Sequence, residues 1–271
     1  MKSLASNFCY TIQMKLSILQ LNINADNYWD SLINFLYKND FDILQLQEVT
    51  GKDTISGNID SKIDCFNNLS LILKEKYNGE LLITQRYSSG PDSYIGNATF
   101  YKKEFLLTEK DEITLHRNVL PFASQSSEFD LVGRKALDLK LKVMEKEISF
   151  INLHGAWGGT TDEKPFQKKQ LEKFIKYLKS LKNPFVFTGD LNIAPDQPSI
   201  LKISELARNL IAEYQILNTL NPRTHTAKAL FPPGAAVDYV FVSGDIKVTD
   251  FRVLKNEDIS DHLGLTAEIE V

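Results

Sequence analysis

The sequence predicts an α/β fold in which two mixed sheets pack face to face, with helices on their outer surfaces. Amphipathic segments at helical spacing alternate with apolar strand-like runs, which indicates β–helix–β units. Elsewhere, several strand-like runs follow one another directly, which indicates antiparallel neighbours. The chain of 271 residues shows no repeat, low-complexity tract or linker, so residues 15–271 are expected to form one domain.

The N-terminal elements are expected from alternation and helical spacing. Residues 1–14 are expected to be a disordered leader, and apolar residues then alternate with polar ones over Lys15–Asn22, as in a half-buried strand. A helix is expected to begin near Asn27, where apolar residues recur at helical spacing, and Phe41–Gln47 is the next strand. Residues 51–60 are rich in Gly, Asp, Ser and Asn, which predicts a loop.

The rest of the chain continues the same pattern. Amphipathic periodicity predicts helices over residues 61–77, 165–181 and 199–213. Apolar or alternating runs predict strands over residues 81–87, 96–101, 129–143, 148–153, 184–189, 237–242, 246–254 and 263–271.

Composition restricts the class of protein. Hydrophobic residues make up 43% of the chain and charged residues 24%, which permits a substantial core. The net charge of -4 gives no global basic surface for nucleic acid, although a local groove or a bound metal can supply positive charge. Two cysteines are too few for a disulfide scaffold, and no apolar run reaches the ~20 residues of a membrane span. We therefore expect a cytoplasmic monomer with no stable membrane insertion.

Polar side chains follow the first two strands at the points where these strands end. Asn22 ends the first strand and Glu48 follows the second. Rigid strand ends are common positions for functional side chains, and amide and carboxylate oxygens are ligands for Mg2+ or Mn2+. The alternative is that Asn22 caps a turn and that Glu48 is solvated.

Two later strands end in the same way. His154 directly follows an apolar strand, although a histidine in such a place can equally be structural. Asp190 and Asn192 follow Gly189, which is expected to permit a tight bend at the strand tip. Because they are two residues apart, Asp190 and Asn192 are expected to face one side if the chain stays extended.

The C-terminal third supplies two acids and an imidazole. Asp238 lies inside an apolar run that should be buried, and a buried carboxylate is costly unless it is paired or hydrogen-bonded. Asp261 and His262 are adjacent, just before the last predicted strand.

Six short motifs at these strand ends share their order with one family. In chain order they are LNIN at 21–24, LQEV at 46–49, NLH at 152–154, GDLN at 189–192, VDYVF at 237–241 and SDH at 260–262. Together they resemble the signatures of the endonuclease/exonuclease/phosphatase superfamily, from about residue 15 to the C-terminus. The resemblance implies a four-layer α/β/β/α sandwich of the deoxyribonuclease I type.

The resemblance also implies a metal-dependent phosphoric ester hydrolase. Glu48, with Asn22 and Asp261, would hold Mg2+ or Mn2+. Asp190 and Asn192 would orient the attacking water and the phosphate, and His154 would donate to a non-bridging oxygen or help to protonate the leaving group. His262 would be the general base, with a pKa suited to neutral pH, and Asp238 would hydrogen-bond its imidazole. The implied reaction is in-line attack by water without a covalent enzyme intermediate.

Two further residues are candidates for contact with the substrate phosphate. Arg134 resembles the phosphate-binding arginine of deoxyribonuclease-like members, and Asn97 lies on a strand that borders the family's site; each can equally be a surface residue. His225 is a candidate for the substrate mouth or an incidental loop histidine. A lysine-rich helix face invites a nucleic-acid interpretation, but a solvated helix face explains it equally well. Its residues are Lys164, Lys168, Lys169, Lys173 and Lys176.

The substrate is expected to be nucleic acid. The Asn152-Leu-His154 segment departs from the pattern of abasic-site endonucleases, and the motif around Asp190 lacks the basic signature of inositol phosphatases. A phospholipid or a small phosphate ester is the alternative substrate. A non-catalytic binding module on the same fold is the alternative from another class.

Overall fold

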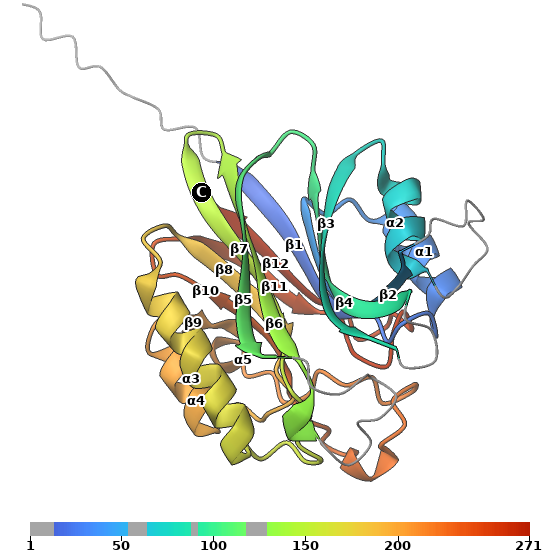
Figure 1. The fold of residues 1–271 in the computed structure, drawn as a ribbon, viewed down its shortest axis with the longest axis vertical. Helices are drawn as coiled ribbons and strands as arrows, with labels where there is room; N and C mark the ends of the chain where they lie inside the picture. Colours follow the sequence, from blue (N-terminus) through green and yellow to red (C-terminus); the bar gives the residue numbers. More distant parts are fainter. Residues whose placement is uncertain (1–13, 54–63, 88–91, 118–128) are drawn as a thin grey trace, which may run out of the picture.

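The computed structural model describes residues 14–53, 64–87, 92–117 and 129–271. Within these residues, two mixed sheets of six strands each pack face to face (Figure 1). The first sheet contains β1 (Lys15–Asn22), β2 (Ile43–Lys52), β3 (Tyr77–Arg86), β4 (Ser93–Lys102), β11 (Lys247–Val253) and β12 (Leu265–Glu270). The second contains β5 (Leu106–His116), β6 (Arg134–Val143), β7 (Lys146–His154), β8 (Phe185–Asp190), β9 (Arg208–Asn209) and β10 (Asp238–Val242).

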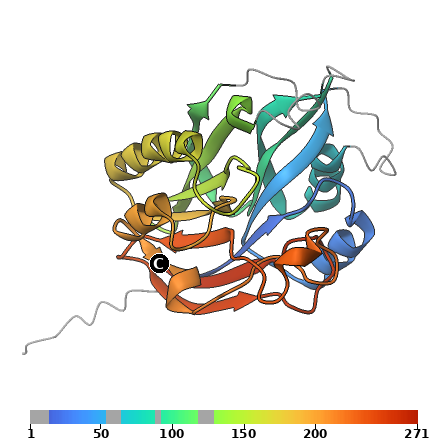
Figure 2. The same ribbon diagram turned by 90° about the horizontal axis from the view of Figure 1, so that it is seen from below.

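The strand order places the N-terminal and C-terminal strands side by side. The order is β11-β12-β1-β2-β4-β3 in the first sheet and β5-β6-β7-β8-β10-β9 in the second. β1 runs parallel to β2, and β7 runs parallel to β8, whereas the other pairs are antiparallel. The ends of β1, β2, β7 and β8 therefore gather at one end of the sandwich, which Figure 2 views from below.

Helices cover the outer face of each sheet (Figure 1). α1 (Trp29–Lys38) and α2 (Cys65–Leu73) lie on the first sheet, and α3 (Pro165–Ser180) and α4 (Pro198–Ser204) lie on the second. The core under α1 and α2 joins Leu19 and Leu21 of β1 to helical residues such as Leu32. The arrangement confirms the predicted four-layer α/β/β/α sandwich. Among the described residues, no helix is long and apolar enough to cross a membrane.

Most predicted elements are present, and the differences have local causes. The predicted strand over 129–143 begins as a 3-10 turn, η2 (Phe129–Leu131), before β6. The helix expected over 61–77 ends at Leu73, because the chain pairs with β4 from Tyr77 onward. The expected helix over 199–213 is broken into α4, β9 and the short helix α5 (Leu210–Glu213), because residues 208–209 pair with the edge of β10.

The expected leader falls mostly outside the described residues. Of residues 1–14, the structure describes only Met14. Its backbone exchanges hydrogen bonds with Val271, so this residue is ordered beside the end of the last strand. The loop predicted over 51–60 also lies largely outside the described residues, and its first two residues belong to β2.

Candidate active site

Three predicted site residues lie in one row across the second sheet. His154 at the end of β7 pairs in register with Asp190 at the end of β8, and Asp190 pairs with Asp238 at the start of β10. In the facing sheet, Asn22 ends β1 opposite Gln47 of β2. The ends of separate strands thus bring distant parts of the chain together at one end of the sandwich.

Glu48 reaches this row because of a bulge in β2. The pairing of β2 with β4 shifts between Leu46 and Val49, and Glu48 has a left-handed φ of 56°. A bulge of this kind redirects a side chain out of the ladder, and a non-glycine residue in this conformation often marks a functional site. The Glu48 Oε1 atom accepts from Asn22 Nδ2 at 3.2 Å and lies 3.8 Å from His154 Nε2.

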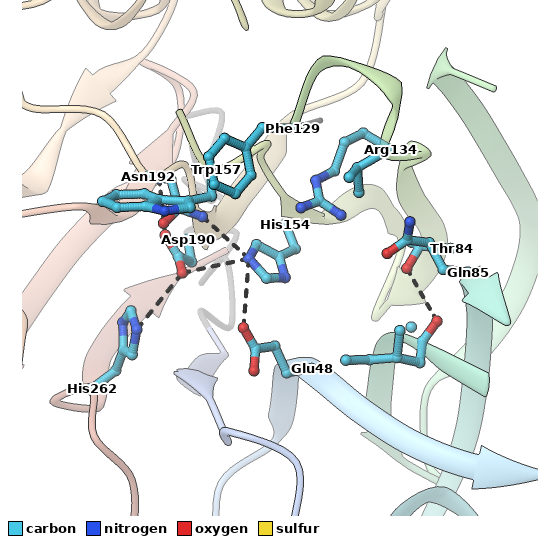
Figure 3. A pocket seen from close by; sticks show the side chains of 13 residues that line it. Glu48, Thr84, Gln85, Phe129, Arg134, His154, Trp157, Asp190, Asn192 and His262 are labelled. Carbon is cyan, nitrogen blue, oxygen red and sulfur yellow. Dashed lines mark hydrogen bonds and ion pairs between the residues drawn. The ribbon is translucent and has the colours of Figure 1, made fainter. Parts of the chain in front are cut away.

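The Asp190 carboxylate lies at the centre of the cluster (Figure 3). Its Oδ2 atom accepts from Asn22 Nδ2 at 3.1 Å and lies 3.6 Å from His154 Nε2 and 3.8 Å from His262 Nε2. Its Oδ1 atom accepts from the backbone N–H of Asn192 at 2.9 Å. This carboxylate therefore connects both sheets and both histidines.

The turn after β8 differs from the expected extended chain. Asn192 has a left-handed φ of 57°, and the hydrogen bond from its N–H to Asp190 closes the turn. Gly189 is also required for a reason other than a bend. A Cβ at this position would lie 1.9 Å from the carbonyl oxygen of Leu153, so glycine permits the close approach of β7 and β8.

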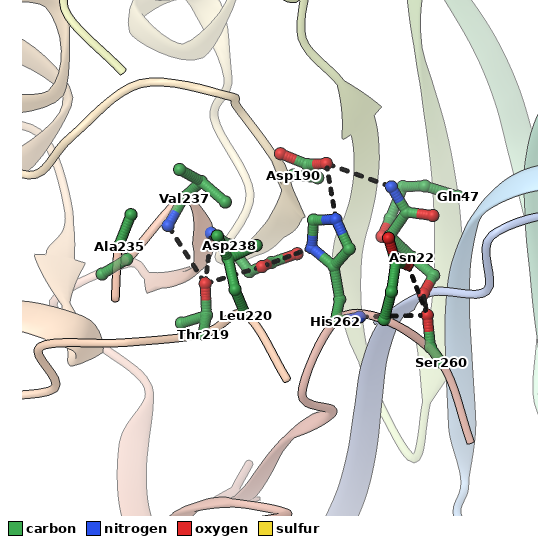
Figure 4. A network of polar contacts seen from close by, with 12 residues as sticks. Asn22, Gln47, Asp190, Thr219, Leu220, Ala235, Val237, Asp238, Ser260 and His262 are labelled. Atoms are coloured by element: carbon green, nitrogen blue, oxygen red, sulfur yellow. Dashed lines mark hydrogen bonds and ion pairs between the residues drawn. The ribbon is translucent and has the colours of Figure 1, made fainter. Parts of the chain in front are cut away.

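The imidazole of His262 is held from the side opposite Asp190 (Figure 4). Its Nδ1 atom lies 2.9 Å from Asp238 Oδ2, and both residues are buried. The same Asp238 oxygen accepts from Thr219 Oγ1 at 2.7 Å, and the other oxygen accepts from Gln20 Nε2 at 3.0 Å. These partners stabilise the carboxylate that sequence reasoning identified as costly inside a strand, and they leave the His262 Nε2 atom facing Asp190.

The packing of charged groups shifts several pKa values. Burial raises the pKa of Asp190; the positive charge of His262 opposes this, and the Asp238 carboxylate adds to it. Burial also raises the pKa of Glu48, against the hydrogen bond from Asn22. Burial alone would lower the pKa of His262, but the Asp238 and Asp190 carboxylates outweigh it and raise that pKa. Without a bound cation, these carboxylates therefore hold the pKa of His262 above the near-neutral value expected for a general base, because they stabilise its charged form.

The pKa of His154 shifts in the opposite direction to that of His262. Burial lowers its pKa well below the usual value, and the positive charges of Arg134 and His262 act in the same direction. Its Nε2 atom lies 3.2 Å from Asn192 Nδ2. The site thus holds one imidazole that favours the neutral form and one that favours the charged form.

Arg134 lines the same pocket, with its guanidinium pointing inward (Figure 3). The residue is 8% exposed, and its Nη1 donates to the carbonyl of Gly133 at 3.2 Å. Its buried Nε atom has no hydrogen-bond partner among the described residues. Burial lowers the pKa of Arg134 to about 10, while the charges of Glu48 and Asp190 oppose that shift. A buried cation with an unused donor is a suitable anion-binding group.

Two predicted residues have other surroundings. Asn97 is buried in β4, and its Nδ2 atom donates to the carbonyl of Lys135 in β6 at 3.2 Å, so this side chain bridges the sheets and is not part of the pocket wall. Asp261 lies beside His262, where its Oδ1 accepts from Ser260 Oγ at 3.3 Å. Its Oδ2 atom is 4.0 Å from His225 Nε2, which places His225 at the site as well.

The donor set fits a hard divalent cation. Glu48 and Asp261 supply carboxylate oxygens. Asn22 turns its Nδ2 toward Glu48 and Asp190, and its Oδ1 accepts from the N–H of Asn24 at 3.0 Å, so this amide would turn over to offer its oxygen to a cation. Oxygen donors of this kind suit Mg2+ or Mn2+. A ligand atom from each of His225, Asp261 and His262 also lies within 4.8 Å of the others.

The sequence did not predict two kinds of residue at the site. Gln20 and Thr219 hydrogen-bond to Asp238, and Trp157 and Phe129 are aromatic residues that line the pocket. Gln20 precedes Asn22 by two residues on the same strand face, and this alternation was the available signal. Thr219 lies in an irregular segment, where no pattern indicates its role. Trp157 and Phe129 both line the pocket, and the signal for Trp157 was a large aromatic residue in a glycine-rich loop directly after His154.

The family model of the endonuclease/exonuclease/phosphatase family matches residues 19–262, so this chain belongs to that family. The match includes every strand end that carries a site residue. No curated protein is similar enough in sequence to count as a relative.

Solved structures share the fold at low sequence identity. An endonuclease/exonuclease/phosphatase protein from Bacteroides vulgatus is 18% identical, with a TM-score of 0.69, over 95% of this chain and 99% of its own. The mannosyl-6-phosphatase of Bacteroides thetaiotaomicron is 18% identical, with a TM-score of 0.63, over 94% and 99%. The human Nocturnin catalytic domain, with a bound sulfate anion, is 17% identical, with a TM-score of 0.64, over 94% and 93%. These similarities show the fold alone.

Proposed function

We propose that this protein is a Mg2+- or Mn2+-dependent phosphodiesterase that cleaves nucleic acid by in-line attack of water. The observation that carries this proposal is the alignment of Asp238, His262 and Asp190 at a pocket that Arg134 also lines, with a guanidinium Nε that has no partner among the residues the structure describes. A carboxylate-supported imidazole next to an anion-binding cation is suited to the hydrolysis of a phosphate ester.

The cation would be held by Glu48, Asp261 and Asn22. When bound there, it would neutralise phosphate charge, stabilise the leaving oxygen and offset part of the carboxylate charge around His262. This assignment is supported by the nearness of the two carboxylates, since the charge of Asp261 adds to the effect of burial in raising the pKa of Glu48.

The protein's own residues divide the remaining work. With the cation bound, His262 would act from its neutral form: Nε2 accepts the proton of the attacking water, and Asp238 stabilises the resulting imidazolium through the 2.9 Å contact at Nδ1. Asp190, held by the N–H of Asn192, orients that water. His154 donates a hydrogen bond to a non-bridging phosphate oxygen.

Arg134 would bind a second non-bridging oxygen or a neighbouring phosphate. Its buried Nε donor supports this role. The sulfate in the Nocturnin domain is in keeping with an anion site on this fold. The mannosyl-6-phosphatase shows that the same fold also occurs with a sugar phosphate as substrate, which makes small phosphate esters the alternative class. Monomeric state and a cytoplasmic location stay predictions from the sequence.

The test is hydrolysis of bis-p-nitrophenyl phosphate by the full chain with Mg2+ or Mn2+, with and without EDTA. Activity with metal that EDTA abolishes would support the proposal. The substrate class would follow from a screen of single-stranded DNA, RNA, 5′-tyrosyl DNA, sphingomyelin, inositol phosphates and mannose 6-phosphate under the same conditions.

A matched pair of variants separates the metal site from general charge. Glu48→Gln should remove most metal-dependent activity, whereas Glu257→Gln, an exposed glutamate, should leave it unchanged. Folded wild-type protein that stays inactive with both metals on all substrates would instead support a non-catalytic binding module.

A further inference from the structure

The pocket at the candidate active site is lined by both charged and aromatic side chains. Its volume is about 390 Å³, within the range of roughly 300–1,000 Å³ that is usual for ligand pockets. The aromatic residues of the lining are Trp157 and Phe129. Figure 3 shows the Trp157 indole on the side of Asp190 and Asn192, with Phe129 next to it and Arg134 across the pocket.

The backbone around Trp157 is held firmly. The N–H of Gly155 donates to the carbonyl of Asp190 at 2.7 Å, and Gln167 Nε2 of α3 donates to the carbonyl of Ala156 at 2.6 Å. A Cβ at Gly155 would lie 2.7 Å from the carbonyl oxygen of Leu191, so the loop packs directly on the turn that carries Asp190 and Asn192. Trp157 is therefore positioned by the same backbone that positions the candidate catalytic groups.

Despite this fixed backbone, the Trp157 side chain is 37% exposed. A single exposed aromatic side chain on a protein surface needs no explanation. Here a second feature points to a ligand, because the buried Arg134 lines the same pocket and its Nε donor has no partner within the described part of the chain. An anion site next to a rigid, exposed indole is suited to a ligand that joins a phosphate to a flat ring.

The aromatic part of the lining is suited to a nucleobase. Phe129 and Val132 also line the pocket and offer no side-chain hydrogen bond, whereas Thr84, Gln85 and Asn192 are its uncharged polar side chains. A nucleobase requires an aromatic surface, which Trp157 and Phe129 supply. We infer that Trp157, with Phe129, forms a stacking subsite for a nucleobase whose attached phosphate binds Arg134. This inference rests on the proposed function and assigns the site that would select a nucleic-acid substrate.

The test compares two ligands that differ only in the base. Thymidine 5′-monophosphate and 2-deoxyribose 5-phosphate are titrated into the full chain by calorimetry in the presence of Mg2+. Wild-type protein should bind the nucleotide roughly 5- to 100-fold more tightly, which is the usual range for stacking of one base on an aromatic side chain. Trp157→Ala should remove most of this preference and leave binding of the sugar phosphate unchanged, while Trp157→Phe should retain part of it.

Fluorescence supplies a second measurement that does not depend on turnover. The chain has two tryptophans, Trp29 and Trp157, and Trp29 is buried in α1. In a Trp29→Phe background, the nucleotide should quench the remaining emission and the sugar phosphate should not. Tyr37→Ala, which removes an aromatic side chain that is 71% exposed on α1, is the matched control and should change neither measurement.

Several outcomes would overturn the subsite. Equal affinity for both ligands would show that the base is not bound, and a Trp157→Ala variant that weakens both ligands alike would indicate a sugar contact or a structural role. The proposed hydrolase activity is tested separately from the base-stacking subsite. Base-dependent binding without hydrolysis would contradict the proposed function alone, and metal-dependent hydrolysis without base preference would contradict the subsite alone.

Discussion

The interior between the two sheets is apolar at one end and polar at the end that carries the site, although the same strands line both ends. On the inner face of the second sheet, one row across β6, β7, β8 and β10 is apolar, with Leu139, Phe150, Val186 and Val242. Two residues along each strand, the row becomes Leu137, Asn152, Thr188 and Val240, and the final row is His154, Asp190 and Asp238. Hydrophobic side chains thus give way to polar ones along β7, β8 and β10 toward the site, whereas β6 stays apolar.

The first sheet shows the same progression. Its paired residues are Ile18 with Ile43, then Gln20 with Gln45, then Asn22 with Gln47. The polar members of these rows hydrogen-bond across the sheets: Thr188 Oγ1 donates to Gln45 Oε1 at 3.0 Å, Gln47 Nε2 to Asn152 Oδ1 at 2.8 Å, and Gln20 Nε2 to Asp238 Oδ1 at 3.0 Å.

This difference suggests that the apolar rows stabilise the fold and that the polar rows align the two sheets. Burial of apolar area is not directional, so the apolar end stabilises the sandwich without specifying how one sheet sits on the other. Hydrogen bonds between buried amides and hydroxyls are directional and require one alignment. We therefore expect the apolar end to determine the free energy of unfolding and the polar end to determine turnover.

The largest effect is expected for the final row. His262→Ala and Asp190→Ala should each lower kcat about 100- to 10,000-fold, because they remove proton transfer or the positioning of water. His262→Ala should still fold, since Asp238 keeps its hydrogen bonds from Thr219 and Gln20. Steady-state kinetics and thermal melts measure both effects. His116→Ala, in β5 outside the pocket, is the control, and a near-normal kcat in either site variant would refute its assigned role.

The apolar end should show the reverse behaviour. Phe150 is fully buried, so Phe150→Ala should lower the free energy of unfolding by about 3–5 kcal/mol while kcat per folded molecule stays nearly unchanged. Urea unfolding measures the free energy of unfolding, and active-site titration of the same preparation gives kcat per folded molecule. A large fall in kcat without loss of stability would show that the two ends are not separable.

A buried acid on the outer face of the second sheet provides a pH-dependent comparison. Asp138 accepts from Tyr177 Oη at 2.6 Å, and burial raises its pKa to about 6. As pH rises from about 4 to 6, the unfolded chain ionises at this position before the folded chain does, so stability falls over this window and stays lower above it. Asp138→Asn should remove this loss, which is at most about 3 kcal/mol. Parallel curves of stability against pH for the two proteins would contradict the assignment.

The smallest effect is expected in the middle row. Asn152 donates to the carbonyls of Leu46 and Ala98 and accepts from Gln47. Asn152→Leu would remove these three buried hydrogen bonds and should cost about 1–3 kcal/mol of unfolding free energy. Because Asn152 lies one row below the site, kcat should fall less than tenfold. A fall as large as that of His262→Ala would mean that this row takes part in the chemistry.

Strong periodicity made most of the fold predictable, and exposure explains the main omission. β1, α1 and α3 alternate or repeat clearly and were predicted nearly to their ends. β5 was not predicted, because it is an exposed edge strand whose charged residues, such as Glu109 and Lys110, obscure the alternation. Edge strands often carry such charges, which discourage pairing with other chains.

The site could be predicted in its members but not in its geometry. Polar residues after apolar strands identified Glu48, His154 and Asp190, because a strand end is visible in the sequence, whereas His262 was identified by its place beside Asp261 just before the last strand. The bulge that turns Glu48 inward and the turn closed by Asn192 depend on pairing between strands, and no local pattern reports them. The same holds for Thr219, whose role exists only because its loop passes beside Asp238.

The row of His154, Asp190 and Asp238 makes strand alignment and activity inseparable. Side chains of a strand alternate between faces, so a slip of β8 by one residue would point Asp190 toward α3 and bring Gly189 into its place. A misaligned molecule would lack the Asp190 carboxylate in the site. It would therefore be inactive and would not be an active enzyme with weaker substrate binding. Imperfect refolding should therefore reduce the fraction of active molecules in a preparation and leave KM unchanged.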